Sequence, residues 1–393
     1  MAQRYSILRD RSRARTSEPF YPGTSALEGI PTPSEPQIES AELSQRELRD
    51  LARDNEVQAL APIMPIKLIR PSEGDEPQEA APATWGVTAV GADTSSRTGA
   101  GAVVSVLDTG IDSSHPAFAG VTVVEQDFSG SGNGDVQGHG THCAGTIFGR
   151  DVDGTRIGVA PGVEKALIGK VLGDDGGGDS EMLFRGMQWA IQERANVVSM
   201  SLGFDFPGMV KSLTESGWPV DLATSAALEA YRANLRMFDA IMGIVRSQQA
   251  FGPGTVVVAA AGNESERQID PDYEIGVSLP AAAEGVVSVG ALAPSPAGLQ
   301  VAPFSNTFPQ VSAPGVNVVS ARAGGGLRSL SGTSMATPHA AGVAALWWED
   351  VFASPVPPNA TTVTARVLAR SAADVFAPDV DVADRGSGLV RAP

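Results

Sequence analysis

Four polar residues in this sequence have the types needed for acyl transfer by a serine hydroxyl. Ser334 follows Gly332 and Thr333 at the start of an expected helix of small residues. A hydroxyl there lies at the positive end of the helix dipole, which suits a nucleophile whose attack generates negative charge. The reaction also needs a base for the hydroxyl proton, a carboxylate that orients the base, and donors for the oxyanion. His139, Asp108 and Asn263 supply one of each.

A purely structural interpretation of Ser334 is a helix N-cap, which is the commoner role of a serine in this position. Gly332 is expected to let the backbone bend tightly before it, and Pro338 to lie in the first turn of the helix, where a missing N–H costs nothing. Two upstream motifs decide against a cap alone: Val106-Leu107-Asp108-Thr109-Gly110 and Gly138-His139-Gly140-Thr141-His142.

The hydrophobic pattern predicts elements that would bring these residues together. From Trp85 onward, strands are expected at 102–107, 164–172, 196–202, 255–261 and 286–291, and helices at 140–148, 180–194, 222–249 and after Ser334. Such alternation indicates βαβ units and a parallel sheet. Asp108, Ser201 and Asn263 follow three of the strands, and the carboxyl ends of parallel strands meet at one edge. The sequence therefore predicts an α/β fold with a polar site at that edge.

Four motifs closely resemble the signature blocks of the subtilisin-like serine proteases (subtilases, peptidase family S8), and they stand in the same order. They are Asp108-Thr109-Gly110-Ile111-Asp112, Gly138-His139-Gly140-Thr141-His142, Ala260-Ala261-Gly262-Asn263 and Gly332-Thr333-Ser334-Met335-Ala336-Thr337-Pro338-His339. The resemblance runs from about residue 85 to the end, where Gly386-Ser387-Gly388-Leu389-Val390 resembles the closing strand. It implies a three-layer α/β fold whose central, mostly parallel sheet is flanked by helices.

The resemblance also implies a role for each residue. Ser334 would be the nucleophile, His139 the general base and then general acid, and Asp108 the carboxylate that orients His139. The Asn263 amide and the Ser334 backbone N–H would form the oxyanion hole. Cys143 resembles the buried cysteine beside the histidine of proteinase K-like members, although a small buried hydrophobe is the plainer interpretation.

Substrate binding in this family resembles β-augmentation, in which a peptide adds as a strand between two backbone segments. The matching segments are Gly176, Gly177 and Gly178 on one side and Ser201, Leu202 and Gly203 on the other. A flexible glycine loop is the alternative for the first. Glu264 and Ser278 are expected near the pocket for the residue before the cut, which would admit large apolar or basic side chains.

The other histidines are expected to serve structure. His142 and His339 lie inside the motifs and are assigned to packing and hydrogen bonding. His115 precedes Pro116 and is assigned to a turn. Asp112 lies a turn beyond the strand end. No metal site is predicted: family members often bind calcium after the first aspartate, but Ala117 stands at the usual acidic position, so structural calcium is possible but unsupported there. Catalysis is expected to need no cofactor.

The chain before residue 84 is divided into two parts. Residues 1–39 are predicted to be a disordered extension. Residues 40–83 contain an expected helix with a capping box of Ser44 and Glu47, an edge strand at 57–69 interrupted by proline, and an acidic linker at 70–82. By resemblance this part would be a reduced propeptide that occupies the active site, and the hypothesis is a zymogen that cuts itself between about Arg70 and Trp85. An extension that binds an unrelated partner is the alternative.

Charge and composition exclude some functions. The net charge of -17 argues against nucleic acid or an anionic membrane as partner. The single cysteine excludes an intramolecular disulfide, and the N-terminus lacks the apolar core of a signal peptide, so the cytoplasm is expected. Residues 204–251 form a longer connection than the family core needs. They are expected to pack on the surface, with docking of a regulatory partner as the alternative.

The function predicted from these observations is that of a serine endopeptidase, with catalytic domain 84–393, acting on peptides or proteins. Two alternatives remain open. One is a peptide ligase or macrocyclase on the same scaffold, in which an amine rather than water accepts the acyl group. The other is a catalytically silent regulatory binding protein, although such proteins usually lack at least one of the four residues.

Overall fold

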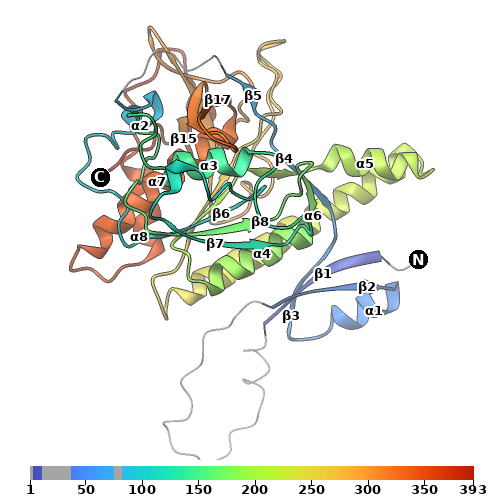
Figure 1. Ribbon diagram of the computed structural model, residues 1–393. Coiled ribbons are helices and arrows are strands. Elements are labelled where there is room, and N and C mark those ends of the chain that lie inside the picture. The colour runs from blue at the N-terminus through green and yellow to red at the C-terminus, as the bar shows by residue number, and fades with distance from the viewer. Residues whose placement is uncertain (1–2, 11–36, 75–81) are drawn as a thin grey trace, which may run out of the picture.

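The computed structural model describes residues 3–10, 37–74 and 82–393 of the chain (Figure 1). The strands are β1 (Gln3–Arg9), β2 (Gln37–Leu43), β3 (Val57–Pro62), β4 (Pro65–Leu68), β5 (Ser72–Glu73), β6 (Val103–Asp108), β7 (Thr122–Asp127), β8 (Lys165–Lys170), β9 (Gly177–Asp179), β10 (Val197–Met200), β11 (Leu202–Phe204), β12 (Val256–Ala260), β13 (Val286–Ser295), β14 (Gly298–Val301), β15 (Val311–Pro314), β16 (Val318–Ala321) and β17 (Leu327–Ser331). The helices are α1 (Gln45–Leu51), α2 (Trp85–Ala89), α3 (His139–Phe148), α4 (Ser180–Gln192), α5 (Phe206–Glu215), α6 (Val220–Gln248), α7 (Thr333–Phe352), α8 (Ala360–Ala369) and α9 (Val382–Arg385), with a short 3₁₀ turn at Pro116–Phe118.

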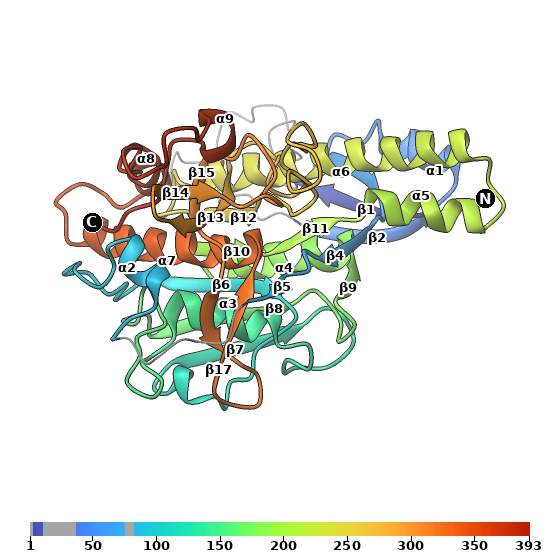
Figure 2. The same cartoon turned by 90° about the horizontal axis from the view of Figure 1, so that it is seen from above.

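A central sheet forms the core of residues 84–393, the predicted catalytic domain. Its strand order is β14-β13-β12-β10-β6-β8-β7, and β15 also pairs with β13. All pairs are parallel except the β13–β14 hairpin. Helices α3 and α7 lie on one face and α4 and α6 on the other (Figure 2). This is the predicted three-layer α/β architecture.

The sheet separates two hydrophobic cores because successive side chains of a strand point to opposite faces. In β6, Val104 and Val106 pack with α3 and α7, whereas Leu107 packs with α4 and α6. In β12, Val258 belongs to the first core and Val257 to the second. These strands are apolar on both faces, as expected of a covered parallel sheet.

The N-terminal residues form a small antiparallel sheet of order β2-β1-β3. The predicted disorder is therefore wrong for Gln3–Arg9 and for the start of β2 at residues 37–39. The short apolar cluster in β1 gains its burial from partners distant in sequence, so that Leu8 is fully buried. Residues 11–36 of the predicted extension lie outside the described residues.

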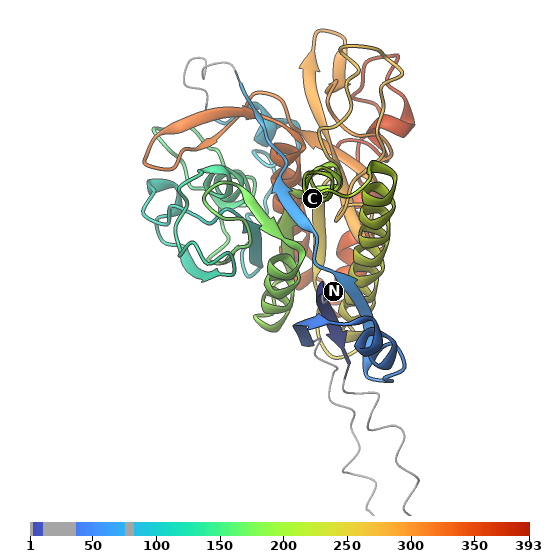
Figure 3. The same cartoon turned by 90° about the vertical axis from the view of Figure 1, so that its right-hand side faces the viewer.

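Helices α4 and α6 support this small sheet (Figure 3). Glu181 of α4 accepts hydrogen bonds from Arg4 and Ser40, and Asn234 of α6 donates one to the carbonyl of Pro62. Helix α1 follows, shorter than expected, with the predicted capping box of Ser44 and Glu47. The small sheet is thus attached to the catalytic part on the face of α4 and α6.

The strand predicted at 57–69 is divided at Ile63 and Met64. β3 is an edge strand, but β4 is not, because it lies between β9 and β11 and is antiparallel to both. The chain then continues to β5, which pairs with the edge of β17. Residues 75–81 of the acidic linker lie outside the described residues. We refer to residues 65–73, which comprise β4, β5 and their connection, as the strap.

The long connection at 204–251 consists of helices α5 and α6, packed against each other. α6 buries Ala227, Met237 and Phe238 in the second core, so most of the connection packs on the domain as expected. Around the turn between the two helices, Trp218, Val220 and Leu222 are exposed. Among the helices described, none is both long and apolar enough to cross a membrane.

Candidate active site

Asp108 and His139 form a buried pair at the carboxyl edge of the sheet. Asp108 ends β6, and His139 is the first residue of α3, after Gly138 in a left-handed conformation (φ 84°). The Nδ1 of His139 lies 2.7 Å from Oδ1 of Asp108. Burial lowers the pKa of His139, but the charge of Asp108, the contact with Cys143 and the hydrogen bond to Asp108 together raise that pKa well above its usual value. Asp108 therefore stabilises the imidazolium form of His139.

Ser334 is the second residue of α7 and is fully buried. Its Oγ donates to the carbonyls of Ile69, at 3.1 Å, and Ser201, at 3.3 Å. Nε2 of His139 has no hydrogen-bond partner among the described residues. Ser334 and His139 both contact Sγ of Cys143, through the Ser334 carbonyl and the imidazole Nδ1, but no hydrogen bond joins the hydroxyl to Nε2 of the imidazole.

Two local expectations around Ser334 are wrong. Gly332 is extended (φ 165°, ψ 163°) rather than tightly bent. Its lack of a side chain matters for space, since a Cβ there would lie 3.0 Å from Nδ2 of Asn263 and 3.5 Å from Cα of Pro71. Pro338 lies inside α7, in its second turn, rather than in the first.

Pro338 has a consequence for the carbonyl of Ser334, which is four residues earlier. Because proline has no N–H, this carbonyl receives no helical hydrogen bond from residue 338. It accepts instead from Oγ of Ser201 at 3.1 Å and from Sγ of Cys143 at 3.4 Å. The backbone carbonyl of Ser334 thus links this residue to the connection between β10 and β11 and to α3.

Asn263 follows β12 beyond Gly262, whose φ of 113° favours glycine. Oδ1 of Asn263 accepts from the N–H and the hydroxyl of Thr333, at 2.9 and 2.8 Å. These bonds orient Nδ2 outward, where it donates to the carbonyl of Arg70 at 3.3 Å. Asn263 thus presents a fixed amide donor to a carbonyl oxygen beside Ser334.

The neighbouring titratable groups are held neutral. Burial lowers the pKa of His142 to about 3 and that of His339 to about 4. His142 contacts the carbonyl of Val318, and His339 that of Met335, so both serve packing and hydrogen bonding. Burial also raises the pKa of Cys143, whose Sγ lies 3.8 Å from Nδ1 of His139.

The strap occupies the slot where a substrate strand was predicted to bind (Figure 3). Leu68 donates its N–H to the carbonyl of Gly176 at 2.9 Å, and the strap pairs with Gly177 and Gly178 on this side and with Leu202 and Gly203 on the other. The structure thus places the two predicted segments on either side of the chain's own strand. Ser201 contacts Ser334 rather than the strap. Sequence reasoning missed which strap residues meet the site, although the three apolar residues Ile66, Leu68 and Ile69 were a usable signal.

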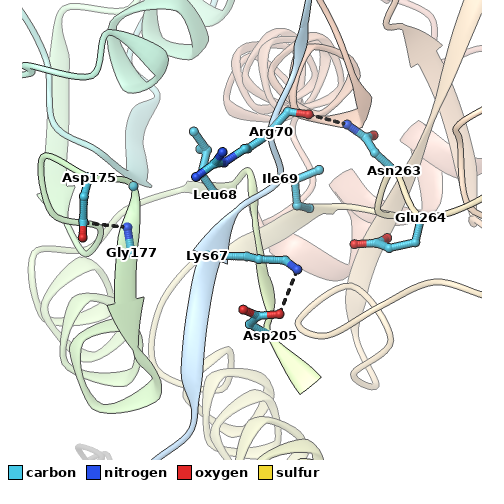
Figure 4. Close-up of a pocket in the computed structure, with 10 residues that line it drawn as sticks. Lys67, Leu68, Ile69, Arg70, Asp175, Gly177, Asp205, Asn263 and Glu264 are labelled. Carbon is cyan, nitrogen blue, oxygen red and sulfur yellow. Dashed lines mark hydrogen bonds and ion pairs between the residues drawn. The ribbon is translucent and has the colours of Figure 1, made fainter. Parts of the chain in front are cut away.

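Ile69 and Arg70 lie at the centre of a cleft of about 530 Å³ (Figure 4). Ile69 is 3% exposed, and its Cγ1 comes within 3.5 Å of a Cβ built on Gly203. Glu264 lines the same cleft and accepts a hydrogen bond from Asn306 at 2.8 Å. Ser278 does not line it, and hydrogen bonds instead to the carbonyl of Ala261.

The described residues contain one cluster of three side chains with metal-ligand atoms close together, namely Asp108, His139 and Cys143. The hydrogen bond between Asp108 and His139 accounts for this cluster without an ion. Ala117, at the position where related proteins often carry an acid for calcium, is fully buried and donates its N–H to Nδ1 of His115.

Comparison with known proteins places this geometry in a family. The profile of the Subtilase family (Peptidase_S8) matches residues 99–387. A thermostable alkaline protease of Halalkalibacterium halodurans is 33% identical over 78% of this chain and 71% of its own length. An intracellular serine protease of Paenibacillus polymyxa is 33% identical over 68% and 69%, and the major intracellular serine protease of Bacillus subtilis 32% over 62% and 67%. The chain belongs to the subtilase family of serine proteases.

Proposed function

We propose that this serine endopeptidase works through an acyl-enzyme, with Ser334 as nucleophile, His139 as general base and acid, and Asp108 as the orienting carboxylate. The observation that carries the proposal is the convergence of Ser334 Oγ and the Asn263 amide on two consecutive carbonyls of a strand bound like a substrate. A peptide carbonyl therefore already lies 3.1 Å from the nucleophile oxygen.

Each residue has a step. His139 removes the proton of Ser334 as Oγ attacks the carbonyl carbon, and Asp108 stabilises the imidazolium that forms. The oxyanion accepts hydrogen bonds from Nδ2 of Asn263 and the backbone N–H of Ser334. His139 then gives its proton to the leaving amine. A water molecule, deprotonated by the same imidazole, hydrolyses the ester and regenerates the hydroxyl.

The strap is proposed to restrain the enzyme as part of a zymogen. It fills both sides of the slot with backbone hydrogen bonds and buries Ile69 in the cleft. The carbonyl of Ile69 lies at the nucleophile, but the asparagine amide binds the next carbonyl, that of Arg70. The bond between Ile69 and Arg70 is thus presented for cleavage in an unproductive position, at the start of the region where self-processing is predicted.

Intact mass of the full-length protein over time, beside Ser334→Ala, tests both proposals. We expect the wild type to separate into residues 1–69 and a chain beginning at Arg70, or to be cut before Trp85, while the variant stays whole. An uncut wild type that hydrolyses casein would overturn the zymogen and leave the endopeptidase. An uncut wild type inactive on casein would favour the silent binding protein. Ligation would appear as products enlarged by an added amine peptide.

The remaining proposals concern the setting of the enzyme. We expect it to act in the cytoplasm, a place consistent with the names of the two intracellular relatives. Catalysis is proposed to need no cofactor, because the polar groups described above supply every step. A regulatory protein partner remains a prediction, for which the exposed Trp218 and Val220 offer the most apolar part of the 204–251 insertion.

A further inference from the structure

The strap shows how a substrate strand is aligned with the enzyme. The carbonyl of Ile69 faces Ser334, so Ile69 occupies the place of the residue before the cut. In the antiparallel pairing with β11, Lys67 lies opposite Gly203 and Leu68 opposite Leu202. Lys67 therefore occupies the position three residues before the cut, and its side chain reveals what surrounds that position.

The ammonium group of Lys67 binds a carboxylate of the enzyme. Its Nζ lies 2.8 Å from Oδ1 of Asp205, which follows β11 directly (Figure 4). The Lys67 side chain is 45% exposed and that of Asp205 22%, so the pair lies at the rim of the cleft. The lysine stem extends along the cleft wall, while its charged end meets the carboxylate.

Asp205 is held in place independently of the strap side chain. It is the N-cap of α5, and Oδ1 accepts the N–H of Gly208 at 3.1 Å. A Cβ at Gly208 would lie 2.0 Å from Oδ2, so the glycine leaves the room that the carboxylate occupies. The carboxylate is therefore preorganised for a cation.

Charge around the cleft is divided between the strap and the enzyme body. Among the lining residues, the cations Lys67 and Arg70 both belong to the strap. The acids Asp175, Asp205 and Glu264 all belong to the body. Once the strap leaves, the cleft presents carboxylates to the incoming peptide.

We propose that Asp205 determines specificity by selecting substrates with lysine or arginine three residues before the cut. The proposal rests on the endopeptidase function above and adds a substrate class, namely peptides with a basic residue at that position and a large aliphatic residue at the cut. The strap meets this requirement with Lys67 and Ile69 and thus occupies the cleft as a substrate would.

The test compares three synthetic peptides of residues 64–73, with alanine in place of Pro71 so that the second residue after the cut has an N–H. They carry lysine, norleucine or glutamate at position 67. The full chain, incubated until its mass is constant, is assayed by mass spectrometry for kcat and KM at low and high salt. We expect lysine to be favoured over norleucine about two- to fivefold, the range for ion pairs of this exposure, mainly through KM, and glutamate to be cut most slowly.

Asp205→Asn is the informative variant, because asparagine caps a helix as well as aspartate does and removes only the charge. We expect the lysine-to-norleucine ratio to fall to about one. Asp381→Asn, which changes the N-cap of α9 and does not line the cleft, is the matched control and should keep the ratio. High salt should reduce the preference of the wild type as well.

The outcomes separate the two proposals. Equal cleavage of the lysine and norleucine peptides by the wild type, or a preference that persists in Asp205→Asn, would overturn the role of Asp205 and leave the endopeptidase intact. Failure to cut any of the three peptides would overturn the proposed function and this inference with it.

Discussion

The hydroxyl of Ser334 donates its hydrogen bond to the carbonyl of Ile69, at 3.1 Å, while Nε2 of His139 has no hydrogen-bond partner among the described residues. The next carbonyl, that of Arg70, accepts from Asn263. The proposed nucleophile and the proposed oxyanion donor thus bind consecutive carbonyls of the strap rather than one carbonyl. Attack requires the strap to shift so that the Ile69 carbonyl meets both groups, which explains how an intact peptide can lie in a complete site.

Replacing Asn263 by alanine should lower kcat about 100- to 1000-fold, which is the loss known for the equivalent donor in subtilisin. The amide is fixed by Thr333, so its energy of reorganisation is small and its contribution arises in the transition state. Steady-state kinetics with a peptide substrate should show KM nearly unchanged. A purely raised KM would instead make Asn263 a ground-state binding residue.

Asp108→Asn should lower kcat by about four orders of magnitude, as for the aspartate of other serine proteases. Because the carboxylate raises the pKa of His139, its removal should also lower that pKa and move the acidic limb of kcat/KM to lower pH. NMR titration of the His139 ring in Ser334→Ala, with and without Asp108→Asn, checks the direction. An unchanged titration would contradict the assigned coupling.

Ile69→Asp should release the strap, because Ile69 is buried in the cleft and a carboxylate there would lose its hydration among acidic neighbours. The full-length variant should hydrolyse an added peptide without the lag expected of the wild type. Glu42→Gln, at an exposed position of β2, is the control and should keep the lag. Equal time courses for all three proteins would show that the strap does not restrain the enzyme.

Stability should fall in mild acid through His339. Its folded pKa of about 4 lies below the ordinary value of 6.5, so the unfolded chain binds the proton first. The loss begins as the pH drops below 6.5 and amounts to roughly 2–3 kcal/mol by pH 4.5. Urea unfolding at pH 7.5, 5.5 and 4.5 checks this. His339→Gln should be less stable at pH 7.5 but lose less on acidification, and parallel slopes would refute the assignment.

Thiol-binding mercurials should inhibit the enzyme, because Sγ of Cys143 lies 3.8 Å from Nδ1 of His139 and contacts the carbonyl of Ser334. A mercury atom on the thiol would displace one or both. Iodoacetamide should react slowly, since burial raises the pKa of the thiol. Cys143→Ala should resist the mercurial, and inhibition of that variant would place the reactive group elsewhere.

The sequence was most informative where local pattern and local structure coincide. Strands β6, β10 and β12 are largely apolar on both faces, and a polar residue ends β6 and follows β10 and β12, namely Asp108, Ser201 and Asn263. The type of these strands and their common edge were therefore predictable. Helix α4 and the capping box of α1 were likewise visible in short windows. The prediction of an α/β sheet that brings Asp108, Ser201 and Asn263 to one edge follows from these local signals, and the parallel pairing of β6, β10 and β12 agrees with it. His139 and Ser334 were assigned to the same site by the family resemblance.

The features that the sequence did not predict depend on contacts between residues distant in sequence. β1 is a short strand whose burial comes from β2 and β3, separated from it in sequence. The need for glycine at position 332 comes from Asn263 and Pro71 rather than from its own backbone angles. Asp205 resembles an ordinary helix cap until Lys67 is placed beside it. The hydrophobic periodicity of a short sequence window cannot predict contacts between residues that are far apart in the sequence.

The strap is joined to the rest of the chain through β3 on one side and beyond Glu73 on the other, so the cleft meets it as an intramolecular ligand. Its effective concentration is in the millimolar range expected of short tethers, and a diffusing peptide must compete with that. Once one strap bond is hydrolysed, the strap fragment is no longer tethered and can return to the cleft only by bimolecular binding. After cleavage, dilution favours dissociation of the fragment, so the activity per enzyme molecule rises as the protein is diluted. Inhibition by the strap then depends on the protein concentration.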